Sequence, residues 1–288
     1  MRIDEARGWL EQALASSESP RADAEVLLCH VLGVSRTWLR TWPERLLSDE
    51  AQATLQTLLA RRQRGEPVAH LVGTREFWSL PLQVNASTLI PRPDTEVLVE
   101  EALALIPEQA PSGHPWCVAD LGTGTGAIAL ALKQERPWLQ VLAVEQSAEA
   151  CALARANATH LALDIEVRQG SWLTPLAGVC CDLLLSNPPY IDAADPHLQQ
   201  GDVRFEPLSA LVADEAGLAD LRHLIATAPT VLRTGGWLLL EHGWQQGAAV
   251  RELLQQQGYQ AVRTRRDYGD QERVTLGQWP GGQHESDA

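Results

Sequence analysis

Short apolar runs alternate with helix-like segments through the second half of the chain, and this alternation constrains the fold more than any other feature. Leucine-rich and β-branched runs indicate strands at residues 117–121, 141–145, 165–169, 182–186 and 237–241. Apolar positions recurring every three or four residues indicate helices at 127–134, 148–159, 218–232 and 247–257. Alternating strands and helices build a parallel sheet with helices on both faces. The sequence therefore predicts a doubly wound α/β fold.

The end of the chain departs from this alternation. Two β-like runs, at 260–264 and 273–277, are joined by the turn-rich segment 266–270 with no helix between them. Parallel neighbours need a long crossover connection, whereas antiparallel strands can be joined by a short turn. We therefore expect the last strand of the sheet to be antiparallel.

The first 75 residues have a purely helical pattern. Their apolar residues recur at three- and four-residue spacing, and breaks at Ser19-Pro20, Gly33 and Trp42-Pro43 divide them into short helices. A small helical bundle is the simplest arrangement of such helices. We expect this bundle at 1–75, a hairpin or linker at 76–93, the α/β domain at 94–280 and a flexible tail at 281–288.

Charge is distributed unevenly along the chain. Residues 1–75 carry as many acidic as basic side chains, so the whole net charge of −14 falls on residues 76–288. Nucleic-acid binding draws on Lys and Arg against phosphate, so this acidic balance argues against a direct nucleic-acid partner. A protein or small-molecule substrate is favoured.

Several functional classes find no support in the sequence. No apolar run approaches the roughly 20 residues that span a bilayer, and the N-terminus lacks the pattern of a secretory signal, so no membrane partner and a cytoplasmic location are expected. The single lysine, Lys133, has no Walker A context. The five cysteines form no CxxC pair, and we expect no metal site.

A glycine-rich loop follows the first predicted strand of the sheet. It reads Asp120-Leu121-Gly122-Thr123-Gly124-Thr125-Gly126 and opens the next helix, where glycines let the backbone approach a bound nucleotide. Glu145 ends the following strand, where a carboxylate can accept hydrogen bonds from both ribose hydroxyls of an adenosine. A tight turn that serves only helix packing is the alternative. The glycines together with the placed acid favour nucleoside binding.

The sequence Asn187-Pro188-Pro189-Tyr190 follows the most apolar strand, at the carboxyl edge of the sheet where ligands bind. Neither proline has an N–H, so the turn is rigid and rich in acceptors. An amide or amine nitrogen bound by the Asn187 side-chain oxygen and the Pro188 carbonyl can turn its lone pair toward a sulfonium methyl. Tyr190 would pack its ring against the flat substrate group. This predicts S-adenosylmethionine-dependent methylation of a planar nitrogen, with no general base evident.

Four stretches together resemble the protein glutamine N5-methyltransferases, and in particular those that act on bacterial peptide chain release factors. The stretches are Gly65-Glu66-Pro67-Val68 to Gly73, the segment 89–96, the glycine loop, and 187–190 followed by 202–207. The resemblance implies a seven-stranded class I methyltransferase sheet behind an N-terminal helical domain that grips the release factor. It also implies that the methyl acceptor is the glutamine of a Gly-Gly-Gln loop.

The resemblance also implies roles for individual residues. Asp120, Gly122, Thr123, Gly124, Thr125, Gly126 and Glu145 would hold S-adenosylmethionine, Trp172 would flank its adenine, and Asn187 would bridge cofactor and substrate. Asn187, Pro188, Pro189 and Tyr190 would bind the substrate, with Asn187, Pro188 and Tyr190 acting in catalysis. The family commonly has Asp at the position of Glu145, so the ribose would be held by a side chain one methylene longer.

Three alternatives remain open from the sequence. The same turn occurs in enzymes that methylate adenine N6 or guanine N2 of nucleic acids, and a ribosomal-protein glutamine is a second possible acceptor. A protein that binds the cofactor without turning it over is the third. The tail contains Gly281-Gly282-Gln283, which repeats the acceptor tripeptide, and chance in a glycine-rich terminus is the expected explanation.

Overall fold

The computed structural model describes residues 1–281 as two compact units. The first unit contains Met1–Thr74 together with Gln199–Phe205, and the second contains Arg75–Leu198 and the chain from Glu206 onward. Nothing in the sequence pattern indicated that 199–205 belongs with the first unit. The functional division predicted above, including a release-factor-binding role for 1–75, stays a prediction, and the tail after Gly281, with Gly282 and Gln283, lies outside the described residues.

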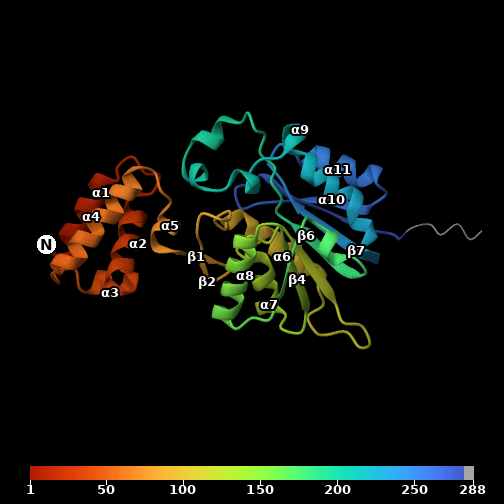
Figure 1. The fold of residues 1–288 in the computed structure, drawn as a ribbon, viewed down its shortest axis with the longest axis horizontal. Coiled ribbons are helices and arrows are strands. Elements are labelled where there is room, and N and C mark those ends of the chain that lie inside the picture. Colours follow the sequence, from red (N-terminus) through yellow and green to blue (C-terminus); the bar gives the residue numbers. More distant parts are fainter. Residues whose placement is uncertain (282–288) are drawn as a thin grey trace, which may run out of the picture. The chain divides into compact units, whose positions relative to one another are not determined.

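The first unit is a small bundle of helices around one apolar core (Figure 1). The helices are α1 Ile3–Ala13, α2 Pro20–Leu32, α3 Arg36–Thr41, α4 Asp49–Gln63 and α5 Val68–Val72, and the short 3-10 helix η4 is Asp202–Phe205. Leu10, Leu27, Leu28 and Leu55 are fully buried in the core. The breaks fall where the residue types require them: Pro20 opens α2, and Gly33 ends it with a left-handed φ of 64°.

Arg62 ties the segment 199–205 into this unit. Its guanidinium contacts Asp23 at 2.9 Å and Asp202 at 3.3 Å, and it also donates to the carbonyl of Glu66 at 3.1 Å. Gly65 has a φ of 94°, and a Cβ there would lie 2.2 Å from the Arg204 side chain. The left-handed φ favours glycine where the 199–205 segment meets the end of α4, and a larger residue would also displace the end of the Arg204 side chain.

The second unit contains a seven-stranded sheet in the order β5-β4-β3-β6-β7-β9-β8. Its strands are β3 Cys117–Leu121, β4 Gln140–Glu145, β5 Glu166–Gln169, β6 Cys181–Ser186, β7 Leu232–Glu241, β8 Gln260–Arg266 and β9 Glu272–Gln278. The first five pair in parallel, whereas β9 runs antiparallel to both β7 and β8. The prediction of a doubly wound sheet with an antiparallel last strand is confirmed.

Helices cover both faces of this sheet (Figure 1). They are α6 Glu96–Leu105, α7 Ala127–Glu135, α8 Ala148–Leu161, α10 Ala219–Thr227 and α11 Gly247–Gln256. The short segment α9 Asp214–Gly217 precedes α10 and is a turn with left-handed φ values at Glu215 and Ala216. Side chains alternate along each central strand, so Leu183 and Leu185 enter the core with α6 and α7, while Leu184 enters the core with α10 and α11. A hairpin of β1 Thr74–Phe77 and β2 Leu80–Gln83 precedes the sheet.

One helix and one strand differ from their predicted ranges by more than two residues at one end. The helix expected at 218–232 ends at Thr227, because Pro229 lies in the short 3-10 helix η6 Ala228–Thr230 and cannot donate to a continuing helical ladder. Leu232 then pairs with Cys181, so β7 begins there and not at residue 237. Between residues 1 and 281, no helix is long and apolar enough to cross a membrane.

Candidate active site

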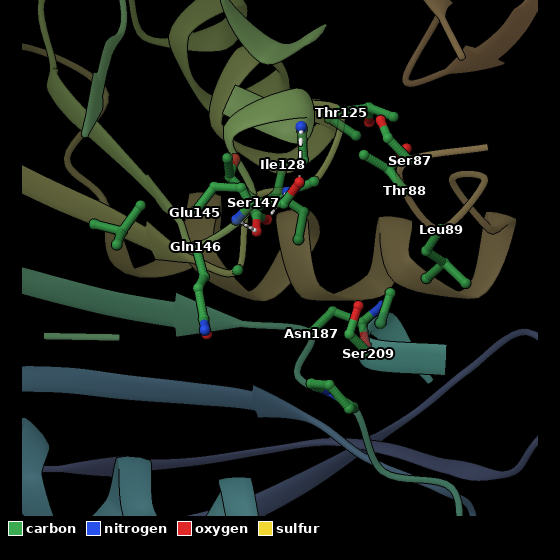
Figure 2. Close-up of a pocket in the computed structure, with 18 of the residues that line it drawn as sticks. Ser87, Thr88, Leu89, Thr125, Ile128, Glu145, Gln146, Ser147, Asn187 and Ser209 are labelled. Atoms are coloured by element: carbon green, nitrogen blue, oxygen red, sulfur yellow. Dashed lines mark hydrogen bonds between the residues drawn. The ribbon is translucent and has the colours of Figure 1, made fainter. Parts of the chain in front are cut away.

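A cavity of about 480 Å³ opens at the carboxyl edge of β3, β4 and β6 (Figure 2). Its volume falls within the roughly 300–1,000 Å³ typical of small-molecule and cofactor sites. The predicted site residues on its lining are Gly122, Thr123, Gly124, Thr125, Glu145, Trp172, Asn187 and Pro189. Asp120, Gly126, Pro188 and Tyr190 lie outside the lining. The segments that were predicted separately as a glycine loop and an acceptor turn therefore share one cavity.

The glycine loop adopts a conformation that only glycine accepts readily. Gly122, Gly124 and Gly126 have φ values of 74°, 55° and 84°. A Cβ on Gly122 would lie 3.4 Å from the ring of Trp172, on the cavity side. A Cβ on Gly126 would instead meet Leu130 at 3.2 Å, in the helix α7 that the loop opens. The first two glycines leave room for a ligand, and the third serves helix packing.

Asp120 stabilises the glycine loop through Thr123. Its carboxyl is fully buried and accepts a hydrogen bond from the Thr123 hydroxyl at 2.5 Å. Burial raises the pKa of Asp120 to about 7, and the nearby charge of Glu145 adds to that increase. Since Asp120 is absent from the cavity lining, it supports the predicted cofactor-binding loop through Thr123 and does not face the cavity.

Glu145 ends β4 and directs its carboxylate to the cavity (Figure 2). One oxygen accepts the Gly124 N–H at 3.0 Å and the other accepts the Ser147 N–H at 2.9 Å. Each carboxylate oxygen can accept more than one hydrogen bond, so both retain capacity for a hydroxyl of a ligand. The side chain thus joins the glycine loop to the start of α8 and still presents two acceptors.

The acceptor turn presents Asn187 to the cavity and turns Tyr190 away from it. The Asn187 side-chain nitrogen donates to the Thr95 hydroxyl at 3.3 Å, and both residues line the cavity. The Tyr190 hydroxyl donates to the buried Glu241 at 3.3 Å. The predicted packing of the Tyr190 ring against a substrate therefore has no support from the cavity lining, and the role of the buried Pro188 carbonyl stays a prediction.

The backbone of Tyr190 is fixed by a strained turn. Its carbonyl accepts a hydrogen bond from the Gln246 side chain at 3.1 Å. A Cβ on Gly217 would lie 2.1 Å from the same carbonyl, and the preceding residues Glu215 and Ala216 both have a φ of 55°. Left-handed conformations at non-glycine residues cost free energy and persist only where the surroundings enforce them. This turn therefore holds Tyr190 tightly behind the cavity.

An ion pair between the buried Glu206 and the partly exposed Arg92 joins the segments 89–96 and 202–207, which the sequence singled out only by resemblance. Glu206 accepts the Ile90 N–H at 2.9 Å and pairs with Arg92 at 2.8 Å. The side chain of Glu206 is fully buried, and Arg92 lines the cavity. No local pattern could join residues so far apart in the chain. The pair anchors the segment 89–92 as one wall of the cavity.

Two family models match the chain. The model described as PrmC N-terminal domain matches residues 5–73, and the model described as Methyltransferase small domain matches residues 98–202. The release factor glutamine methyltransferase of Escherichia coli (strain K12) is 56% identical over 279 residues, which cover 96% of this chain and 99% of that protein. The chain belongs to the release factor glutamine methyltransferase family. The protein of the same name from Vibrio cholerae is 56% identical and covers 92% of each chain.

Solved structures of lower similarity share the fold of this family member. A methyltransferase from Pyrococcus furiosus matches with a TM-score of 0.53 at 16% identity, over 79% of this chain and all of that one. The hMettl16 catalytic domain matches with a TM-score of 0.57 at 18% identity, over 85% of each chain. The predictions of a class I methyltransferase fold and of an S-adenosylmethionine-dependent methyltransferase are confirmed.

The glycine-loop cavity fits S-adenosylmethionine. Gly122 and Gly124 leave open backbone at the end of β3, and Glu145 offers acceptors at the end of β4. The cofactor supplies an electrophilic methyl group on a sulfonium. Which of these residues touch it stays a proposal, carried by this geometry.

Two buried carboxyls, Asp120 and Glu241, make the free energy of unfolding of this methyltransferase depend on pH. Burial raises the pKa of Asp120 and of Glu241 to about 7. The two carboxyls thus bind a proton more tightly in the folded chain than in the unfolded chain. Their contribution to the free energy of unfolding is fully present below the ordinary carboxyl pKa of the unfolded chain, and it is lost as the pH rises to about 7. We expect the wild-type stability to fall relative to Glu241→Gln by about 1.4 kcal/mol per pH unit within that window.

Urea unfolding of the two proteins at several pH values between 5 and 8 measures this difference. Subtracting the variant cancels the carboxyls whose pKa is lowered, such as Glu66 and Asp267. A difference that stays constant across this range would show that Glu241 is ionised throughout.

Proposed function

We propose that this chain transfers the methyl group of S-adenosylmethionine to the side-chain amide nitrogen of the glutamine in the Gly-Gly-Gln loop of peptide chain release factors. The observation that carries the proposal is the position of Asn187. Its amide nitrogen donates a hydrogen bond to the Thr95 hydroxyl, and Asn187 lines the same cavity as the glycine loop. Its side-chain oxygen is therefore available to an N–H of an acceptor held beside the cofactor.

The chemistry of the acceptor explains what such a residue contributes. A glutamine amide nitrogen is a weak nucleophile, because its lone pair is delocalised into the carbonyl. An N–H hydrogen bond to the Asn187 oxygen, with the Pro188 carbonyl as a second acceptor, holds that nitrogen in line with the methyl group. The nitrogen–carbon bond forms as the sulfur–carbon bond breaks, and one amide proton then leaves to solvent. Asn187 is the catalytic residue of this proposal, since it touches the reacting group.

Charge favours a protein substrate over a nucleic acid. The net charge of −14 lies on the chain beyond residue 75, which includes the methyltransferase unit. Direct contact with phosphates would have to overcome that repulsion. A release factor as substrate would also place the enzyme in the cytoplasm. The relatives that share the family carry the release factor in their names, which supports the same choice over a ribosomal-protein glutamine.

Mass spectrometry of the acceptor peptide tests the proposal. Purified release factor, incubated with the enzyme and S-adenosylmethionine and then digested, should yield a Gly-Gly-Gln peptide carrying one added methyl group on glutamine. A release factor whose glutamine is replaced by alanine is the matched control and should stay unlabelled. Total RNA and ribosomal proteins are offered in parallel with labelled cofactor. Labelling of either one, with an unmodified release factor, would overturn the proposal.

A further inference from the structure

Leu208 is an exposed apolar side chain next to the cavity lining. It is 63% exposed, whereas Leu211 and Ala213, on the same segment, are buried. Among residues 1–281, the other large apolar side chains that are exposed are Met1, Trp42, Leu46, Trp244 and Tyr268. Leu208 alone of this group is adjacent in sequence to a residue that lines the cavity, Ser209. Single exposed leucines are common on protein surfaces, so the position of Leu208 points to a role more than its exposure does.

The segment that carries Leu208 begins at a wall of the cavity. Glu206, two residues before Leu208, accepts the Ile90 N–H at 2.9 Å and the Arg92 guanidinium at 2.8 Å. The Glu206 side chain is fully buried, so these contacts are shielded from water. Pro207 follows, and its ring restricts the backbone immediately before Leu208. Leu208 therefore extends from a rigid support.

The same segment ends at the acceptor turn. The short 3-10 helix η5 Leu208–Ala210 is closed by a hydrogen bond from the Leu211 N–H to the Leu208 carbonyl at 3.0 Å. The Leu211 carbonyl in turn accepts the Ile191 N–H at 2.9 Å. Ile191 directly follows Tyr190, the last residue of the acceptor turn. The backbone of Leu208 is thus connected by hydrogen bonds to the acceptor turn as well as to the cavity wall.

This position lies on the path of a protein substrate. Ser209 and Asn187 both line the cavity, so a glutamine side chain that reaches Asn187 enters the space that Ser209 borders (Figure 2). A cavity of about 480 Å³ has the size of a cofactor site, so the rest of a release factor has to stay outside it. In the Gly-Gly-Gln loop proposed above, the residues before the glutamine are glycines. Because glycine has no side chain, an exposed leucine at the rim can pack directly against their backbone.

We propose that Leu208 is a substrate-binding residue that packs against the backbone of the Gly-Gly-Gln loop as its glutamine enters the cavity. The proposal deepens the function given above and rests on it for the identity of the partner. A leucine held on a rigid segment loses little conformational entropy when the loop binds. Since Leu208 lies outside the cavity lining, it contributes to binding of the release factor and not of the cofactor. Its contact is the same before and during methyl transfer, so it lowers KM and leaves kcat unchanged.

Leu208→Ser tests this contact in steady-state kinetics. We expect KM for the release factor to rise by about 5- to 30-fold, the effect of losing the apolar surface that binding would bury. The kcat at saturating release factor and the cofactor Kd from calorimetry should each change by less than about twofold. The melting temperature should stay the same, because the side chain is exposed in the free protein. Leu208→Met keeps an apolar side chain of similar volume and should retain the wild-type KM.

A matched control and a cross-linking experiment locate the contact. Tyr268 is 65% exposed in the same unit, but neither Tyr268 nor its neighbours in sequence line the cavity, so Tyr268→Ser should keep the wild-type KM. Leu208→p-benzoylphenylalanine places a photoreactive group at the rim and requires no turnover. On irradiation with the release factor and cofactor, the cross-link should map to the proteolytic peptide that contains Gly-Gly-Gln. The same group at position 268 should give no cross-link to that peptide.

The outcomes separate this inference from the proposed function. If wild type methylates the release factor and Leu208→Ser has the wild-type KM, the role of Leu208 is wrong and the proposed function stands. An equal rise of KM in Leu208→Ser and Tyr268→Ser, or a cross-link from position 208 outside the Gly-Gly-Gln peptide, would also overturn that role. If wild type labels RNA and leaves the release factor unmodified, the proposed function fails and the partner named for Leu208 fails with it.

Discussion

Replacing Asn187 by alanine will strongly slow methyl transfer while leaving most of the cofactor affinity intact. The substitution removes the acceptor that holds the substrate nitrogen, and the loss of one such positioned group at a reacting centre costs about 10²- to 10³-fold in kcat. The glycine loop and Glu145, which provide the cofactor contacts we propose, lie on other strands and keep their hydrogen bonds. Initial rates with labelled cofactor and titration calorimetry measure the two quantities.

Two further variants complete the Asn187 experiment. Asn187→Gln keeps the amide and moves it by one methylene, so a strong loss of kcat would identify position as the decisive property. Asp195→Ala removes a partly exposed carboxylate that contacts His197 on the loop after the turn, and it should behave as wild type. If Asn187→Ala transferred methyl groups at the wild-type rate, the acceptor turn would not be the catalytic element. A protein that only senses the cofactor would show no transfer in wild type.

The second large effect is expected at Glu145. Glu145→Ala should weaken binding of S-adenosylmethionine by about 10- to 100-fold, because each hydrogen bond to a charged group contributes about 1.5–3 kcal/mol. The substitution also releases the Gly124 and Ser147 N–H groups that the carboxylate now accepts. Titration calorimetry measures the affinity directly, and Glu166→Ala, on the exposed edge strand β5, serves as the control.

A cofactor analogue separates the two causes of that loss. An analogue without ribose hydroxyls should bind to wild type and to Glu145→Ala with more similar affinity than S-adenosylmethionine does, if the carboxylate accepts from the ribose. The same loss for both ligands would assign Glu145 to the support of the loop alone. Glu145→Asp shortens the side chain to the length common in the family and should retain most of the affinity.

Local patterns predicted the elements of the sheet well, because the spacing of apolar residues in each strand or helix shows which of its faces is buried. The glycine loop and the acceptor turn were also visible, since both depend on consecutive residues. The start of β7 was missed, because pairing of Leu232 with Cys181 depends on the neighbouring strand. No local pattern marks that contact.

The candidate site was predicted less completely for the same reason. Asn187 and Thr95 are 92 positions apart, and Arg92 and Glu206 are 114 positions apart, so only the fold brings each pair together. The sequence also did not indicate that Tyr190 points to Glu241 rather than into the cavity. An isolated acid at a strand end, such as Glu241, has no motif. Its partners can be found only in three dimensions.

A single cut after residue 74 cannot separate the helical unit from the methyltransferase unit, because the helical unit also contains the segment 199–205. Because the chain leaves the methyltransferase unit after Leu198 and returns at Glu206, the helical unit is discontinuous in sequence. A fragment beginning at residue 75 would still carry Asp202 but would lack Arg62, and its loop would have lost its anchor immediately before Glu206. Deletion or exchange of the first 74 residues is therefore not a neutral operation on the catalytic unit. The two units are expected to be inherited together.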